Sequence, residues 1–63
     1  MEKELIKALE KLEILKRDNK IKDFEMSIYT NKSGEIKHSF SLKKDDKFEV
    51  FFKVEKLLNF QGF

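Results

Sequence analysis

The sequence predicts a small α+β fold: an N-terminal helix, an antiparallel hairpin and a third element, with the helical part packed on one face of a small sheet. Three observations support this prediction. Apolar residues recur every three or four positions in the first third of the chain, the period changes to two in the middle third, and a turn with a glycine divides that middle third. With 63 residues and no Pro, the chain is expected to form a single domain over residues 1–63.

The first element is a predicted helix over residues 2–19. Its apolar residues share one face of a helix with 3.6 residues per turn, and they are Leu5, Ala8, Leu9, Leu12 and Leu15. Acidic residues near its start and basic residues near its end complement the helix macrodipole. Asp18 and Asn19 both favour turns over helix interiors, so the helix is expected to end there.

The middle of the chain predicts two strands, residues 22–30 and 35–42, because apolar and polar residues alternate in both. Between them, Asn31–Gly34 fits a type I turn followed by a glycine in the left-handed conformation, which makes a three-residue loop. Such a loop places Ile28 opposite His38 and aligns the apolar residues of both strands on one face. A two-residue loop would instead place a lysine opposite Ile28, so the pattern favours the three-residue loop.

Residues 46–59 fit two templates. A strand is indicated by alternation of the apolar residues Phe48, Val50, Phe52 and Val54 with other residues. A helix is indicated because one sector of a helical wheel holds Val50, Phe51, Val54, Leu57 and Leu58, and Asp46–Glu49 resembles a capping box. The strand would leave Phe51 on the solvent face, so we favour the helix and keep a third antiparallel strand as the alternative. Residues 60–63 are expected to form a C-terminal tail.

The small size of the chain predicts self-association. A single core of this size contributes only about 3–5 kcal/mol, and a chain with no Cys and one His, His38, lacks the residues for disulfides or a structural zinc site. A two-stranded hairpin is also marginal alone. We therefore expect a homodimer or higher oligomer, and a surface that also binds another protein. The expected interface residues are Leu5, Leu9, Leu12, Leu15, Phe51, Phe60 and Phe63.

The residue pattern does not indicate catalysis or metal binding. His38 has no Cys to pair with and no cluster of further ligands, so we interpret it as a structural histidine beside the apolar face. Asp45 and Asp46 lie between two elements, where Asp is common in turns and helix caps. We expect no catalytic residues, no metal site and no cofactor.

Nucleic-acid binding is the alternative hypothesis. Acidic and basic residues nearly cancel, at a net charge of +2, and only one Arg is present to read bases. The basic residues nevertheless form two clusters, which are Lys16, Arg17, Lys20 and Lys22, and Lys43, Lys44 and Lys47. If the fold brought both clusters together, they could contact phosphates, although acidic residues interrupt each of them.

The leading functional hypothesis is a non-enzymatic protein-interaction module. A chain this small with seven Phe is expected to use aromatic surface for contacts with a partner protein. Its size and its Lys-, Ile- and Asn-rich composition suggest a regulatory or inhibitory accessory protein of a phage or other mobile element. Because Met1–Glu4 does not resemble a signal peptide and no apolar run approaches the roughly 20 residues of a membrane span, we expect a cytoplasmic protein with no membrane contact.

Overall fold

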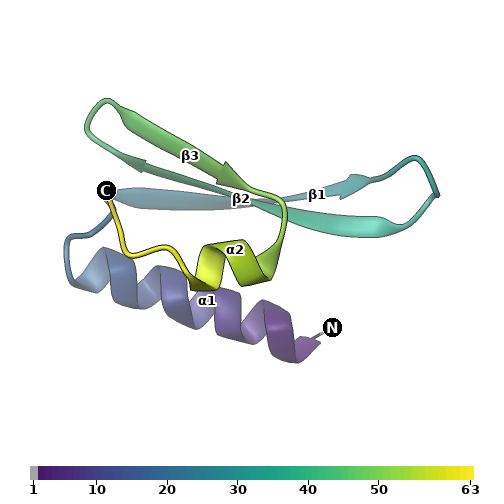
Figure 1. Ribbon diagram of the computed structural model, residues 1–63, viewed down its shortest axis with the longest axis horizontal. Helices are drawn as coiled ribbons and strands as arrows, with labels where there is room; N and C mark the ends of the chain where they lie inside the picture. The colour runs from purple at the N-terminus through teal and green to yellow at the C-terminus, as the bar shows by residue number, and fades with distance from the viewer. Residues whose placement is uncertain (1) are drawn as a thin grey trace.

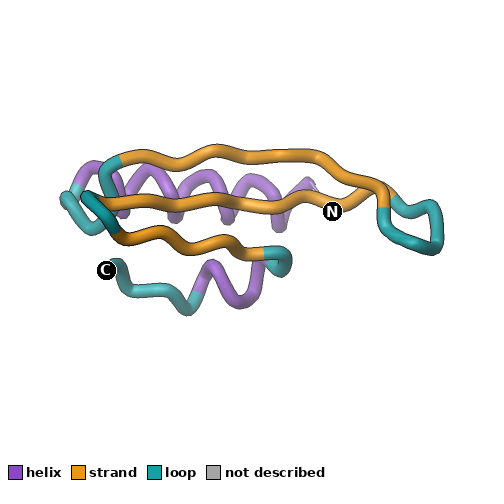
Figure 2. The backbone as a smooth tube through the Cα atoms, turned by 90° about the horizontal axis from the view of Figure 1, so that it is seen from above, coloured by secondary structure: helices purple, strands orange, loops and turns teal. Residues whose placement is uncertain are grey.

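A computed structural model describes residues 2–63 and contains two helices and three strands. In chain order these are α1 (Glu2–Arg17), β1 (Asp23–Thr30), β2 (Ile36–Lys44), β3 (Lys47–Phe51) and α2 (Val54–Leu58). The strands form one antiparallel sheet in the order β1-β2-β3, and α1 runs along one face of it (Figure 1). The short α2 and the C-terminal segment follow β3 (Figure 2). The predicted α+β fold, with its helices packed on a small antiparallel sheet, is confirmed.

Helix α1 ends at Arg17, two residues before the end predicted from the sequence. Asn19 takes the left-handed conformation, with a φ of 59°, and its N–H donates to the Lys16 carbonyl at 3.2 Å. The N–H of Lys20 donates to the Leu15 carbonyl at 2.8 Å. These two bonds satisfy carbonyls of the last helical turn and direct the chain back towards the sheet.

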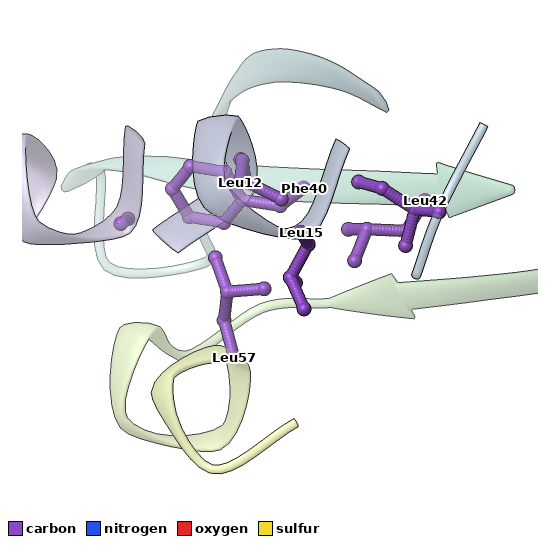
Figure 3. Close-up of a cluster of buried hydrophobic side chains, with 7 residues drawn as sticks. Leu12, Leu15, Phe40, Leu42 and Leu57 are labelled. Carbon is purple, nitrogen blue, oxygen red and sulfur yellow. The ribbon is translucent and has the colours of Figure 1, made fainter. Parts of the chain in front are cut away.

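The core lies between α1 and the face of the sheet that α1 covers. Seven buried apolar side chains form it, and they are Ala8, Leu12, Leu15, Ile21, Phe40, Leu42 and Leu57. The side chains labelled in the close-up of Figure 3 come from α1, β2 and α2, and Ile21 joins the core from the loop after α1. Phe40 is the largest fully buried residue, so β2 supplies the centre of the core.

The hairpin between β1 and β2 confirms the predicted register, with Ile28 opposite His38. Its loop is held by a hydrogen bond from the Gly34 N–H to the Asn31 carbonyl at 3.0 Å. The Asn31 side-chain oxygen accepts from the N–H groups of Ser33 and Glu35 at 3.0 and 2.9 Å. Gly34 has a φ of 80°, as this type of loop requires.

Residues 46–59 contain both of the elements that the sequence left open. The strand alternative holds for Lys47–Phe51, and the favoured helix is found only for Val54–Leu58. Asp45 and Asp46 form a two-residue turn in which Asp45 has a φ of 56°, so Asp46 does not cap a helix. The turn brings β3 back along β2, and pairing with a strand that is already in place stabilises the extended conformation there.

The side chains of β3 point to the opposite faces of the sheet from those expected for a strand in this segment. Lys44 pairs with Lys47, and therefore Phe51 pairs with Phe40 and lies on the core face. Phe48 pairs with Lys43, so Phe48 lies on the face that points away from α1. The apolar alternation of β3 thus faces outwards, and we call this second face of the sheet the outer face.

Candidate binding surfaces

The aromatic residues of the C-terminal tail pack on the chain itself. The Phe60 ring lies 5.3 Å from that of Phe51 and 5.2 Å from that of Phe63, measured between ring centroids. The Phe63 N–H donates to the Lys20 carbonyl at 3.3 Å. At Gly62, where φ is 106°, a Cβ atom would lie 2.6 Å from the Cβ of Lys20, so only glycine allows this close approach. The tail therefore joins the last β-strand to the loop that follows α1.

The residues expected to form an interface contribute to the core or lie against it. Leu12 and Leu15 are buried, and the other five are partly buried and pack against the core, namely Leu5, Leu9, Phe51, Phe60 and Phe63. The large apolar side chains that are exposed form a different set, which is Ile6, Ile14, Met26, Ile28, Ile36, Phe48 and Phe52. Contacts with another molecule are more readily made by this second set.

The outer face of the sheet carries two of these exposed side chains. Phe48 is 63% exposed and Phe52, just after β3, is 62% exposed. Tyr29 of β1 approaches Phe52 edge to face, with 5.8 Å between ring centroids, and Val50 is half-buried. The structure therefore places an aromatic group, defined as Tyr29, Phe48 and Phe52, on the face that points away from α1, with Val50 beside it.

Small polar side chains separate the aromatic residues on this face. Ser39 and Ser41 occupy the central strand, and Ser27 pairs with Ser39 on β1. Ser39 is only 8% exposed, although it lies on the side away from α1. On this face the central strand therefore carries small polar side chains, and the flanking strands carry the aromatic rings.

Neither Phe48 nor Phe52 is among the interface residues expected from the sequence. One signal was present, because the adjacent residues Phe51 and Phe52 must point to opposite faces if the segment is extended. One phenylalanine therefore has to face solvent in any strand through this segment. The paired turn formers Asp45 and Asp46 were the second signal, since two such residues suit a two-residue connection.

The two clusters of basic residues meet at one end of the molecule. The Lys22 N–H donates to the Lys43 carbonyl at 2.8 Å, and the Lys44 ammonium donates to the Asn19 carbonyl at 2.6 Å. A hollow of about 370 Å³ lies between the two segments, lined by Lys16, Asn19, Ile21, Lys22, Lys44 and Asp45. The fold therefore brings together clusters that are about 20 residues apart in the sequence.

Acidic residues pair with part of this basic end. Lys16 lies 3.7 Å from Asp23, and Arg17 lies 3.0 Å from Asp18. The hydrogen bond from Arg17, together with its charge, lowers the pKa of the Asp18 carboxyl. The remaining exposed lysines form no ion pair within residues 2–63, and they are Lys20, Lys22, Lys43 and Lys47.

A second hollow, of about 460 Å³, opens at the other end of the sheet. Its apolar wall includes Leu5, Val54 and Leu58, and the partly buried His38 lies beside them. Its charged residues are mixed in sign, with Glu4 among the acidic ones. In the part of the chain that the structure describes, no three His, Asp or Glu side chains gather as a metal site would require.

Comparison of the chain with protein-family models, with curated proteins and with solved structures finds no match in any of the three. Within residues 2–63, neither helix is long and apolar enough to cross a membrane.

Proposed function

We propose that this chain is a non-enzymatic protein-interaction module that binds a partner protein through the outer face of its sheet. The observation that supports this most strongly is the exposure of Phe48 and Phe52, each above 60%, on a face whose central strand carries Ser39 and Ser41. Aromatic side chains on a surface have large apolar area to bury and are frequent at the centres of protein interfaces. The sheet beneath them fixes their positions before binding.

The polar surroundings of the aromatic group also suit a protein partner. Serines on the central strand lie in the middle of this face, where they can hydrogen-bond to a partner, and their small size leaves room for side chains that insert between the rings. Lys43 and Glu25, on the same face, offer charges of both signs at its rim. A regulatory or inhibitory role in a phage or other mobile element, within the cytoplasm, is the biological setting we propose for this module.

The test compares a double variant of the outer face with a control on α1. Phe48→Ser with Phe52→Ser removes both exposed rings, and Ile14→Ser removes a side chain that is 45% exposed on the helix. Tagged proteins are expressed in the native host, and the co-purified proteins are compared. We expect a partner that is retained by wild type and by Ile14→Ser and lost from the double variant. Equal recovery with all three proteins would contradict the proposal.

Binding of single-stranded nucleic acid is the second candidate function. The observation that favours it is the convergence of the two lysine clusters, because Lys22 and Lys43 are joined by a backbone hydrogen bond. Phe48 pairs with Lys43 across the sheet, so an aromatic ring lies next to this basic end. Positive charge beside exposed aromatic rings is the combination that binds backbone phosphates and stacks bases.

Fluorescence anisotropy with a labelled random-sequence oligonucleotide tests this candidate. Binding at about 50 mM salt with a log–log salt slope of roughly 0.7 per phosphate contact would support it. Lys22→Gln with Lys43→Gln should then reduce the slope, whereas Lys7→Gln with Lys53→Gln, at the opposite end, should leave it unchanged. Absence of binding at low salt would eliminate this function.

A further inference from the structure

The two edges of the sheet are covered to different extents. The chain continues from β3 into α2 and the tail, which lie along the β3 side (Figure 2). Strand β1 is the other edge, is eight residues long, and has no segment of residues 2–63 beside its outer side. An edge strand of this length with no Pro presents a row of backbone donors and acceptors to a further strand.

The hairpin loop determines which of these backbone groups point outwards. Asn31 donates its N–H to the Glu35 carbonyl at 3.0 Å, so odd-numbered residues of β1 form the hydrogen-bonded pairs with β2. The N–H and C=O groups of the even-numbered residues therefore point away from β2, and these residues are Phe24, Met26, Ile28 and Thr30. The Phe24 N–H donates to the carboxylate of Asp23 at 2.8 Å, which agrees with its outward direction.

Two of these even-numbered residues, Met26 and Ile28, carry exposed apolar side chains. Ile28 is 66% exposed and Met26 is 37% exposed, although both lie on the face of the sheet that α1 covers. Strand β1 has a neighbouring strand only on its β2 side, so no strand of residues 2–63 covers these two side chains from the open edge. A strand added beside β1 would cover both side chains and satisfy the outward backbone groups together.

We propose that the added strand is β1 of a second copy of this chain, paired antiparallel across a two-fold axis at Ser27. In this register Met26 lies opposite the partner's Ile28, and by symmetry Ile28 lies opposite the partner's Met26. Both are hydrogen-bonded pairs, since Met26 and Ile28 have outward backbone groups. Met26 therefore covers the partner's Ile28, and Ile28 covers the partner's Met26. The same contact occurs twice about the two-fold axis, as an isologous interface requires.

The rest of the strand is compatible with this register. Phe24 lies opposite the partner's Thr30, so the remaining two residues with outward backbone groups also form a pair. On the outer face, Glu25 lies opposite the partner's Tyr29, and like charges do not face one another along β1. A register shifted by one residue would pair residues of the core face with residues of the outer face.

Such a dimer has one continuous six-stranded sheet with both α1 helices on the same side. The two outer faces then lie side by side. A partner protein with two binding sites therefore gains apparent affinity, because the two aromatic groups are linked. The dimer stands apart from the proposed function, because the Met26 and Ile28 side chains lie on the opposite face from Phe48 and Phe52. It also differs from the interface expected from the apolar face of the first helix.

Single-cysteine variants test the register, since the chain contains no Cys. Ser27 is exposed and would meet its own counterpart in a non-hydrogen-bonded pair, where the Cα atoms are about 4.5 Å apart and a disulfide can form. Glu25 is the control, because it is exposed on the same strand and face but is displaced from its counterpart by several residues. We expect Ser27→Cys to give a covalent dimer under mild oxidation much faster than Glu25→Cys.

Sedimentation of the wild-type chain and of Ile28→Lys completes the test. We expect a dimer at high micromolar concentration for the wild type and a folded monomer for Ile28→Lys, because a lysine placed against Met26 at both ends of the pair opposes association. A wild-type monomer at all concentrations would overturn the proposal. So would equal cross-linking rates for the two cysteine variants, or a dimer that Ile28→Lys leaves intact.

Discussion

The two turns of the sheet differ in length by one residue, and this difference decides which side chains are buried. The Asn31–Gly34 turn leaves a three-residue loop, so residues of like parity pair across β1 and β2 and their apolar residues share the core face. The turn between β2 and β3 has two residues, Asp45 and Asp46, so even-numbered residues of β3 pair with odd-numbered residues of β2. Phe48 therefore points outwards although it has the same parity as Phe40.

The comparison shows that an alternating apolar pattern predicts a strand without predicting its buried face. In β2 the buried face is the apolar one, since Phe40 and Leu42 are fully buried. In β3 the residue that packs on the core is Phe51, whereas the alternating apolar residues Phe48 and Val50 lie on the other face. A sheet that exposes aromatic residues in this way departs from the rule that large apolar side chains face the core. Such departures are expected where a surface has a function.

The largest effect on stability is expected for a substitution at the centre of the core face of the sheet. Phe40→Ala removes a ring that is 0% exposed, and we expect a loss of about 3–5 kcal/mol in the free energy of unfolding. That loss equals the whole stability expected for a core of this size. The variant should be unfolded at 25 °C by circular dichroism. A cooperative thermal transition close to that of the wild type would show that Phe40 is not the centre of the core.

The next comparison uses two phenylalanines of the same strand. Phe51→Ala should lower the free energy of unfolding by about 2–3 kcal/mol, because the ring packs against the core and against Phe60. Phe48→Ala should change it by less than about 0.5 kcal/mol, because the ring is exposed. Urea unfolding of both variants measures the difference. Equal losses would mean that the two-residue turn does not fix the face of β3.

The sequence predicted those elements for which the residue periodicity and the turn-forming residues indicate the same structure. The first helix, both hairpin strands and their register followed from periodicity and from one turn, since Asn31 and Gly34 specify that turn without any distant contact. The segment after Lys44 did not follow, because Phe51, Val54 and Leu57 fit a helix face as well as they fit a strand and a short helix. Pairing with β2 decided between the two, and that is a tertiary contact.

The candidate surfaces were less predictable than the fold for the same reason. The basic clusters were visible in the sequence, but their union depends on the loop after α1 lying beside the β2–β3 turn. The packing of Phe60 and Phe63 depends on Gly62, whose close contact with Lys20 joins segments more than 40 residues apart. Exposure of Phe48 and Phe52 depends on the length of one turn.

The two glycines differ in what an added methyl group would meet. Both have positive φ, but a Cβ at Gly34 has nothing within 4 Å, whereas a Cβ at Gly62 lies 2.6 Å from the Cβ of Lys20. Gly34→Ala should therefore cost about 1 kcal/mol from backbone strain alone. Gly62→Ala adds a steric clash, and we expect about 2 kcal/mol and displacement of the tail. Urea unfolding measures both losses, and a smaller loss for Gly62→Ala would contradict the packed position of the tail.

The smallest effect is expected in the two-residue turn itself. Asp45 has a φ of 56°, so Asp45→Gly removes backbone strain, and the flexibility of glycine in the unfolded chain offsets part of that gain. We expect a net stabilisation of about 0.5 kcal/mol. Asp46→Gly is the control, since only Asn19 and Asp45 among the described non-glycine residues have positive φ, and it should destabilise the chain by a similar amount. The melting temperatures should therefore shift in opposite directions.

The central claim is that β3 turns Phe51 towards the core and Phe48 towards solvent, and ring contacts measured by NMR test it most directly. A nuclear Overhauser spectrum of the wild-type chain should connect the Phe51 ring with that of Phe60, whose centroids are 5.3 Å apart, and the Tyr29 ring with that of Phe52, at 5.8 Å. It should connect Phe48 with no residue of the core. Cross-peaks from the Phe48 ring to Phe40 or Leu42, with none between Phe51 and Phe60, would contradict the account.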